Sequence, residues 1–461
     1  MSTATLTLRS ALQAGRDMRL ALVGAGGKTS AMALLARQFE PPVLLAASTH
    51  LGAWQVELAD RHFIIENPTQ IAAAAQGLSG VNLFTGPLVS DRRLSGLDDA
   101  SLAALAALAD QLGAPLLLEA DGSRQRPLKA PGAHEPVIPD WVRQVVVVAG
   151  LAGLGQPLNE DRQVVHRPEQ FAQLAAMAID APIGPQALAR MLCHPQGGLK
   201  SIPPGARRMV LLNQADDPAR QDLAMAMVDP LLKEYDRVIV AALRPEGRPD
   251  QPGRVLAACQ PVAAVLLAGG SSTRLGQPKA LLEWRGKPLI RHGVESALAA
   301  GLSPLVVVLG AVDQPIRQAL LGLPVHYAIN PDWQAGQSTS LRAGLRAAQA
   351  NTARALGAVV FLLADQPFVS AGLLRALRHQ HRCSLSAVIA PTIGDRRTNP
   401  VLFDQVTFAA LDTLVGDTGG RAIFDRFAPT ALPWEDARLL LDVDTPEDYQ
   451  RLLEMEREDE R

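Results

Sequence analysis

The chain has 461 residues, more than one hydrophobic core usually supports, so we expect two or three domains and start from two. Hydrophobic residues make up 48% and charged residues 20%, a balance that favours buried cores and excludes a disordered chain. The formal net charge is only −2, so the chain has no general positive field that would attract nucleic acid or an anionic membrane.

Cysteine spacing and apolar runs limit the remaining classes of protein. Cys193, Cys259 and Cys383 lie far apart, so they form no CxxC pair or zinc-type cluster and do not support an oxidising compartment. No apolar run reaches the ~18 residues that a membrane span needs, and the N-terminus lacks a signal-peptide pattern. We therefore expect a cytoplasmic protein with small-molecule substrates and with neither a nucleic-acid nor a membrane partner.

Short apolar runs alternate with longer Ala- and Leu-rich amphipathic stretches along the chain. This pattern is typical of parallel strands joined by crossover helices and predicts the α/β class. In the first half, the expected buried strands are residues 20–23, 43–47, 115–118, 144–148, 209–212 and 238–241. Expected helices between them include residues 29–38 and 100–112.

Pro, Gly and Arg break both periodicities between residues 243 and 261, so we place the domain boundary there. The predicted domains are residues 1–245 and 262–461, with a linker at 246–261. After the linker the alternation restarts at Val262, and the next expected strands are residues 305–309, 325–329, 358–363 and 387–390. Both halves open with a strand that runs into a Gly-rich turn, but the text around the two turns differs, so we predict no internal repeat.

The first Gly-rich turn has the setting of a phosphate-binding loop. Residues 24–30 read GAGGKTS and lie between an expected strand and an expected helix. Lys28 is placed to reach β- and γ-phosphates, and the Thr29 hydroxyl is placed to hold Mg²⁺. A full Walker A motif has a Gly where this chain has Leu22, so the loop is a shorter variant, and a tight turn without a nucleotide is the alternative.

Two later segments fit an NTPase. Residues 116–122 read LLLEADG and end a buried strand with two carboxylates, as a Walker B segment does. Residues 211–216 read LLNQAD and resemble the NKxD element that reads guanine in GTPases, but Gln214 replaces the Lys and leaves base recognition open. The simpler interpretation is that Asn213 and Asp216 only terminate a strand. The expected nucleotide-binding residues of this half are Gly24, Gly26, Gly27, Lys28, Thr29 and Asp121.

Several motifs of the first half together resemble the YqeC family over about residues 6–242. These motifs are residues 24–30, 119–123, 129–136 and 165–169. The family is associated by name with selenium-dependent molybdenum hydroxylases, so the resemblance implies a P-loop-like accessory domain with a molybdenum hydroxylase apoenzyme as partner. His134 and Glu135 are adjacent and point different ways, so we expect a structural role for them and no metal site.

The second Gly-rich turn carries the strongest single signal. Residues 267–279 read LAGGSSTRLGQPK directly after a buried strand. The glycines let backbone N–H groups approach a polyphosphate, while Arg274 and Lys279 supply positive charge. For the glycines alone, an ordinary Gly-rich turn with two solvated cations is the alternative.

This segment resembles the opening motif LAGGxSxRxGxxK of the MobA-like nucleotidyltransferases, and within them the MocA branch of molybdenum cofactor cytidylyltransferases. The resemblance covers about residues 262–453. Five further motifs follow in order, at residues 336–341, 363–367, 399–400, 416–421 and 442–448. It implies a Rossmann-like (GT-A-like) α/β domain that transfers CMP from CTP to molybdopterin and releases pyrophosphate.

Asp365 follows an apolar run, at the carboxyl end of an expected strand, where open α/β sheets bind their ligands. Mg²⁺ takes a few carboxylate oxygens together with phosphate oxygens and water, and Mn²⁺ is an alternative metal. The resemblance adds Asp444 as the second metal ligand, with Asp442 as its competitor and a helix cap as the alternative role of Asp444. The turn after residues 262–267 must then face Asp365.

Residues 336–340 offer small side chains and hydroxyls at the start of an expected helix, residues 338–350, where N–H groups can hold ribose, base or phosphate. An ordinary Ser/Thr N-cap is the alternative. The expected catalytic residues are Arg274, Lys279, Asp365 and Asp444. The expected nucleotide-binding residues are Leu267, Ala268, Gly269, Gly270, Ser271, Ser338 and Asp365, and the acceptor-binding residues are Ser340 and Asn399.

The resemblance also bears on the substrate. Relatives that transfer GMP tend to have an acidic residue before the loop lysine, where this chain has Pro278, so the resemblance favours CTP over GTP. A guanylyltransferase, a sugar-phosphate nucleotidyltransferase and a non-catalytic carrier or chaperone of the cofactor stay open as alternatives.

Overall fold

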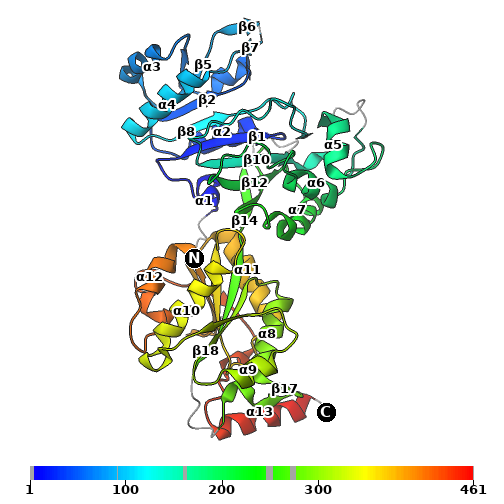
Figure 1. Ribbon diagram of the computed structural model, residues 1–461, viewed down its shortest axis with the longest axis vertical. Coiled ribbons are helices and arrows are strands. Elements are labelled where there is room, and N and C mark those ends of the chain that lie inside the picture. Colours follow the sequence, from blue (N-terminus) through cyan, green and yellow to red (C-terminus); the bar gives the residue numbers. More distant parts are fainter. Residues whose placement is uncertain (1–4, 91, 159–163, 245–252, 270–276, 460–461) are drawn as a thin grey trace. The chain divides into compact units, whose positions relative to one another are not determined.

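A computed structural model describes residues 5–90, 92–158, 164–244, 253–269 and 277–459. The chain divides into two compact units, Met1–Cys259 and Gln260–Arg461 (Figure 1). Both units have the predicted α/β class. Within the part of the chain that is described, no helix has the length and apolar character needed to cross a bilayer.

The first unit is built on a nine-stranded sheet, in which every neighbouring pair is parallel except β13 and β14, which are antiparallel at one edge. From edge to edge its strands are β14 (Arg254–Cys259), β13 (Arg237–Ala242), β12 (Arg207–Asn213), β10 (Gln144–Gly150), β1 (Arg19–Gly24), β8 (Leu116–Glu119), β2 (Val43–Ala47), β5 (Val81–Thr85) and β4 (Arg61–Ile64). The six strands expected from the sequence are all present in this sheet. β2 and β10 are buried along their whole length, as expected of central strands in a parallel sheet.

The helices of the first unit are α1 (Leu8–Leu12), α2 (Lys28–Ala36), α3 (Thr69–Ala74), α4 (Asp99–Leu112), α5 (Pro168–Ala175), α6 (Pro185–Cys193) and α7 (Pro218–Leu231). Local sequence sets their ends. In α4, Asp98 accepts a hydrogen bond from the backbone N–H of Ser101, and Gly113 ends the helix in the left-handed conformation. Short strands complete the unit: β3 (Leu51–Gly52), β6 (Leu88–Ser90), β7 (Arg93–Leu94), β9 (Leu128–Lys129) and β11 (Val165–His166).

The expected linker at 246–261 needs a correction. Its second half forms β14, which pairs antiparallel with β13 at the edge of the first sheet. Val255 and Ala257 are buried there, and the boundary between the two compact units falls between Cys259 and Gln260. Pro and Gly just before this strand masked its short apolar pattern, because they break periodicity wherever they occur.

The second unit has an eight-stranded mixed sheet. Its main path is β19 (His326–Ile329), β18 (Leu305–Leu309), β15 (Val262–Ala268), β20 (Ala358–Leu363), β23 (Val401–Asp404), β21 (Val388–Ile393) and β22 (Arg396–Arg397), with β24 (Thr430–Pro433) beside β21. β23 runs antiparallel between β20 and β21 and was not expected from the sequence. Two further short strands, β16 (Glu283–Trp284) and β17 (Lys287–Pro288), form a hairpin.

Helices cover both faces of this sheet. They are α8 (Leu289–Ala299), α9 (Gln314–Ala319), α10 (Gln337–Ala350), α11 (Ala371–Ser384), α12 (Phe408–Asp412) and α13 (Pro446–Asp459). Alternate residues of β15 enter two separate cores: Leu266 packs in the core formed with α8 and α11, and Val265 packs in the core formed with α10 and α12. Both faces are therefore closed, and the carboxyl ends of the parallel strands are the place left for a ligand.

Candidate functional site

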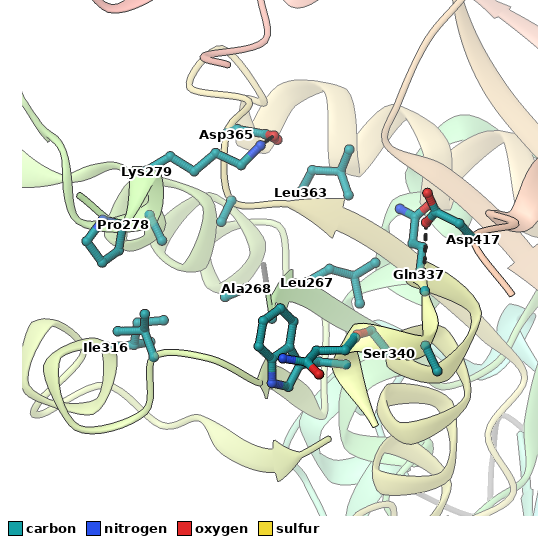
Figure 2. A pocket seen from close by; sticks show the side chains of 18 residues that line it. Leu267, Ala268, Pro278, Lys279, Ile316, Gln337, Ser340, Leu363, Asp365 and Asp417 are labelled. Atoms are coloured by element: carbon teal, nitrogen blue, oxygen red, sulfur yellow. Dashed lines mark hydrogen bonds and ion pairs between the residues drawn. The ribbon is translucent and has the colours of Figure 1, made fainter. Parts of the chain in front are cut away.

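A cavity of about 610 Å³ lies at the carboxyl ends of β15 and β20 in the second unit (Figure 2). β15 and β20 are adjacent and parallel, so the residues that follow them reach the same edge of the sheet. Gly269, after β15, and Asp365, after β20, both line the cavity, as does Lys279. The cavity thus joins the Gly-rich turn to Asp365, as we expected from the sequence.

Lys279 lies between two carboxylates. Its Nζ donates to Asp365 Oδ2, and to Asp444 Oδ1 at 2.9 Å. The backbone N–H of Val443 donates to the carbonyl of Asp365 at 3.0 Å, which holds the turn of Asp444 against the end of β20. Burial alone would lower the pKa of Lys279, but the two carboxylates outweigh it and raise this pKa, so the lysine is charged at neutral pH.

Asp442 and Asp444 competed for the role of second metal ligand. Asp444 shares Lys279 with Asp365, whereas Asp442 Oδ1 accepts a hydrogen bond from Gln366 Nε2 at 2.8 Å. Desolvation, together with the negative charges of Asp365 and Asp444, raises the pKa of Asp442. The geometry therefore favours Asp444 as the partner of Asp365.

The alternative role of Asp444 as a helix cap is wrong. At the start of α13, Thr445 Oγ1 accepts the backbone N–H of Asp448 at 3.2 Å. Asp448 in turn accepts the backbone N–H of Thr445 at 2.9 Å, which makes a reciprocal capping pair. The carboxylate of Asp444 is left for Lys279.

Two observations at this edge fit a divalent cation. Asp365 Oδ1 is buried and has no hydrogen-bond partner among the residues that the structure describes. The ammonium of Lys279 also bridges Asp365 and Asp444, so the pair already holds a positive charge between them. Across the described ranges no group of three or more His, Cys, Asp or Glu side chains could hold a metal ion. The pair alone matches the one or two carboxylates by which proteins commonly hold Mg²⁺, whose other ligands are water and phosphate.

The other expected residues of this half are distributed unevenly. Leu267, Ala268 and Ser340 line the cavity with Gly269. Ser340 Oγ accepts a hydrogen bond from Asn330 Nδ2 at 2.9 Å, which fixes it at the start of α10. Gly270, Ser271 and Arg274 lie outside the described residues.

Ser338 does not take the expected place against the nucleotide. Its side chain is fully buried, and its hydroxyl donates to the carbonyl of Gly416 at 2.7 Å. It therefore ties the start of α10 to the 416–421 segment, and it has no surface from which to contact a ligand. Asn399 lines a second cavity of about 250 Å³, which shares Leu267 and Gln337 with the first.

Sequence reasoning missed several lining residues of the first cavity. Trp333 and Gln334 come from a short helical turn between β19 and α10, and Gln337 begins α10. Asp417 Oδ1 accepts the backbone N–H of Gln337 at 3.2 Å, and both side chains line the cavity (Figure 2). Asp417 lies in the motif at residues 416–421, for which the sequence predicted no role.

In the first unit, the Gly-rich turn after β1 is shaped by its glycines. Gly24, Gly26 and Gly27 have φ angles of +93°, +87° and +126°, and Gly27 directly precedes α2. A Cβ at Gly26 would lie 2.4 Å from Gly150 Cα, and one at Gly27 would lie 2.2 Å from Asn213 Nδ2. Only glycine fits these two positions.

Lys28 folds back over this turn. Its Nζ donates to the carbonyl of Gly24 at 2.7 Å and lies 2.9 Å from Asp121 Oδ1. Lys129, which the sequence analysis missed, pairs with Asp121 Oδ2 at 2.8 Å. Burial disfavours the charged form of Lys28, but Asp121 and Glu119 outweigh this and raise its pKa. The turn therefore ends in a buried charge cluster.

Thr29 stands beside the second carboxylate of the Walker-B-like segment. Gln55 Nε2 donates to Thr29 Oγ1 at 2.9 Å and to Glu119 Oε2 at 3.2 Å. Burial raises the pKa of Glu119, and Lys28 opposes this in part. Glu135 pairs with Lys129 at 3.1 Å and with Arg167 at 3.0 Å, in line with the expected structural role.

Comparisons with known proteins divide the chain in the same order. The family model of the YqeC protein matches residues 20–169, and that of the MobA-like NTP transferase domain matches residues 264–431. The protein YqeC of Escherichia coli (strain K12) is 31% identical over 206 residues, which are 43% of this chain and 77% of that protein. Nicotine blue oxidoreductase of Paenarthrobacter nicotinovorans is 34% identical over 203 residues, 42% of this chain and 96% of that protein. Among solved structures, Rv0371c from Mycobacterium tuberculosis H37Rv has 30% identity and a TM-score of 0.37, covering 42% of this chain and 99% of that chain.

Proposed function

Because the chain belongs to the YqeC family through its first unit and to the MobA-like NTP transferase domains through its second, we propose that it is a molybdenum cofactor cytidylyltransferase. The reaction transfers CMP from CTP to molybdopterin and releases pyrophosphate. One observation carries this proposal: beside the turn at Gly269, Lys279 is shared by Asp365 and Asp444 at the edge of a cavity large enough for a nucleotide.

The transfer needs little covalent work from the protein. A phosphate oxygen of the acceptor bonds to the α-phosphorus of CTP, while the bond from that phosphorus to the oxygen of the β-phosphate breaks and pyrophosphate leaves. A phosphate monoester is already an anion near neutral pH, so the acceptor needs no general base. Lys279, charged at this pH, offsets the negative charge that builds up during transfer, and Arg274 is assigned the same task.

Asp365 and Asp444 would hold the magnesium ion. Bound there, it would act as a Lewis acid that neutralises phosphate charge. Lys279 keeps the two carboxylates together before substrate arrives, so their like charges are not left facing each other. The protein thereby pre-organises the charges that the reaction uses.

The two adjoining cavities give the two substrates separate places. We assign the nucleotide to the larger cavity, which Ala268, Gly269 and Pro278 line. The acceptor is assigned to the smaller one, where Asn399 and Arg421 can meet a polar ring system or a phosphate. Ser340, the second residue proposed for acceptor binding, lines the larger cavity only.

The first unit is proposed to bind a nucleotide at Gly24, Gly26, Gly27, Lys28, Thr29 and Asp121, and to assist maturation of a molybdenum hydroxylase. Its family relation and the position of the turn at the start of α2 support this. Lys28 is buried and already paired with Asp121. A bound phosphate group would therefore have to take the place of Asp121 as a partner of this lysine.

The test is pyrophosphate release by the full chain with molybdopterin, Mg²⁺ and either CTP or GTP. Asp365→Asn is expected to lower kcat by about 10²–10³-fold, since it removes charge at the reacting phosphate. Asp412→Asn is the matched control: its carboxylate pairs with Arg346 on the surface, and the rate should not change.

Three outcomes would overturn the assignment. Faster turnover with GTP would show that the enzyme is not a cytidylyltransferase. Turnover of a sugar phosphate without any pterin would show that molybdopterin is not the acceptor. Oxidation of a dye substrate without pyrophosphate release would show that the chain is an oxidoreductase and not a transferase. This outcome is worth measuring because one relative is named an oxidoreductase.

A further inference from the structure

The larger cavity of the second unit has a charged end and an apolar wall. Lys279 and Asp365 form the charged end, whereas Val312, Ile316 and Trp333 line the cavity with apolar surface. Figure 2 shows Ile316 well apart from Asp365. A nucleotide has the same division, since its triphosphate is anionic and its base is flat and uncharged. The proposed reaction accounts for the charged end only.

Trp333 stands on this wall, and its ring is not used in packing against other rings. Its side chain is partly exposed, and within the described ranges it takes part in no aromatic pair and no cation–π contact. Trp284, in a core of the same unit, differs: His292 and Phe368 pack on its ring, with centroids 4.7 Å and 5.3 Å away. An aromatic ring that lines a cavity and pairs with no other ring is suited to a flat ligand.

The turn that carries Trp333 is held by Asn330, which is 3% exposed. Asn330 Nδ2 donates to Thr339 Oγ1 at 2.8 Å and to Ser340 Oγ at 2.9 Å, both near the start of α10. Asn330 Oδ1 accepts the backbone N–H of Asp332 at 3.1 Å. Three hydrogen bonds from one buried amide fix the turn between β19 and α10, so Trp333 is in place before any ligand arrives.

Gly310 lets this turn approach the Gly-rich turn after β15. A Cβ at Gly310 would lie 2.5 Å from the carbonyl oxygen of Gly269 and 3.0 Å from Trp333 Cβ. Because glycine has no side chain, the two turns come together across the end of β18. Trp333 therefore lies beside the turn at which the triphosphate is proposed to bind.

We propose that the base of the bound nucleotide stacks on Trp333, with its triphosphate at Gly269 and Lys279. Every nucleobase has a π-face, and stacking on an aromatic side chain buries this face without reading the edge of the base. Trp333 thus binds the base and does not select it. The inference rests on the proposed binding of a nucleotide in the larger cavity.

The experiment follows the tryptophan fluorescence of the full chain during titration with CTP and Mg²⁺. Of the five tryptophans in the sequence, Trp333 is the one among the described residues that line the cavity. CTP is expected to quench the wild-type fluorescence. Trp333→Phe should lose most of this quenching while its KM for CTP stays within about threefold of the wild-type value, because phenylalanine still stacks. Trp54→Phe is the matched control, since Trp54 is 53% exposed in the first unit, and the quenching should persist.

Trp333→Ala separates a residue that binds the base from one that only supports the fold. Its KM for CTP in pyrophosphate release should rise by about 10–100-fold, because the base loses its stacking partner. The inhibition constant of inorganic pyrophosphate should not change, since pyrophosphate occupies the charged end and has no base. The KM for the acceptor should not change either. A variant with a distorted cavity would bind CTP and pyrophosphate more weakly to the same degree.

Three results would overturn the assignment of Trp333 while pyrophosphate release keeps the transferase proposal intact. They are an unchanged KM for CTP in Trp333→Ala, an equal loss of affinity for CTP and pyrophosphate, and quenching that is absent from the wild type or persists in Trp333→Phe. If GTP is the substrate, the same titrations are run with GTP and the same outcomes apply. Absence of both nucleotide binding and pyrophosphate release in the wild type would overturn the two proposals together.

Discussion

Two Gly-rich turns, one in each unit, bring a lysine to an aspartate in the same way. Lys28 follows the turn after β1 and reaches Asp121, which comes after the neighbouring parallel strand β8. Lys279 follows the turn after β15 and reaches Asp365, after the neighbouring parallel strand β20. The sequences around the turns differ, so topology produces the likeness: adjacent parallel strands end at one edge of the sheet.

The two ion pairs differ in their burial. In the first unit both side chains are 2% exposed, and the cavity beside them holds only about 20 Å³. In the second unit the lysine is 27% and the aspartate 11% exposed, beside about 610 Å³. The same residue types at the same topological position are therefore buried in one unit and partly exposed in the other.

Removal of the two aspartates should have very different effects on the stability of the two units. Asp121→Ala should destabilise the first unit by about 3–5 kcal/mol, because two buried ammonium groups lose their shared carboxylate. Asp365→Ala should cost the second unit less than about 1 kcal/mol, because its pair is partly solvated. Hydrogen exchange of peptides from β1 and β15 measures each unit separately. Equal losses of protection in the two units would show that the difference in burial has no energetic consequence.

Replacement of a glycine in each turn should also affect the two units differently, with a smaller loss of stability. Gly26→Ala puts a Cβ 2.4 Å from Gly150 Cα at a φ of +87°, so a loss of about 1–3 kcal/mol is expected. Among the described residues, the atom nearest to a Cβ at Gly269 is Ser340 Oγ at 3.3 Å, so Gly269→Ala should cost less than about 0.5 kcal/mol. Pulse proteolysis in urea reports both values. A greater loss at Gly269 would mean that the second turn is the more tightly packed one.

Most of the strands that could be predicted have continuous apolar runs. β5 was missed because Asn82 interrupts its pattern, yet Asn82 is fully buried and its Nδ2 donates to the carbonyls of Val43 and Gly80. β23 was missed because it is short and directly follows Pro400. A buried polar residue with long-range partners, or a strand paired only through tertiary structure, leaves no local pattern to detect.

Site residues that follow strands could also be predicted, since strand ends share an edge. Lys129 and Gln55 could not, because each reaches the turn from a segment whose path depends on the whole fold. Ser338 looked like a ligand contact for the opposite reason: its position at the start of a helix was clear, but its burial against Gly416 was not.

The smallest expected effect concerns protonation beside the buried cluster. Burial, followed by the positive charges of Arg167, Lys129 and Arg124, lowers the pKa of His166 to about 4 from 6.5. Between these pH values the unfolded chain binds more protons at this site than the folded one, so stability of the first unit is fully present above pH 6.5 and is lost as pH falls toward 4. The loss is small because His166 is partly exposed.

An NMR titration of His166 tests this directly. The midpoint should lie near pH 4, and Arg167→Gln should raise it toward 6.5, because it removes the positive charge that lowers this pKa most. A wild-type midpoint near 6.5 would mean that solvent screens these cations. In that case the first cluster would be open in the way that the Lys279 site is, and the contrast between a closed and an open ion pair would no longer hold.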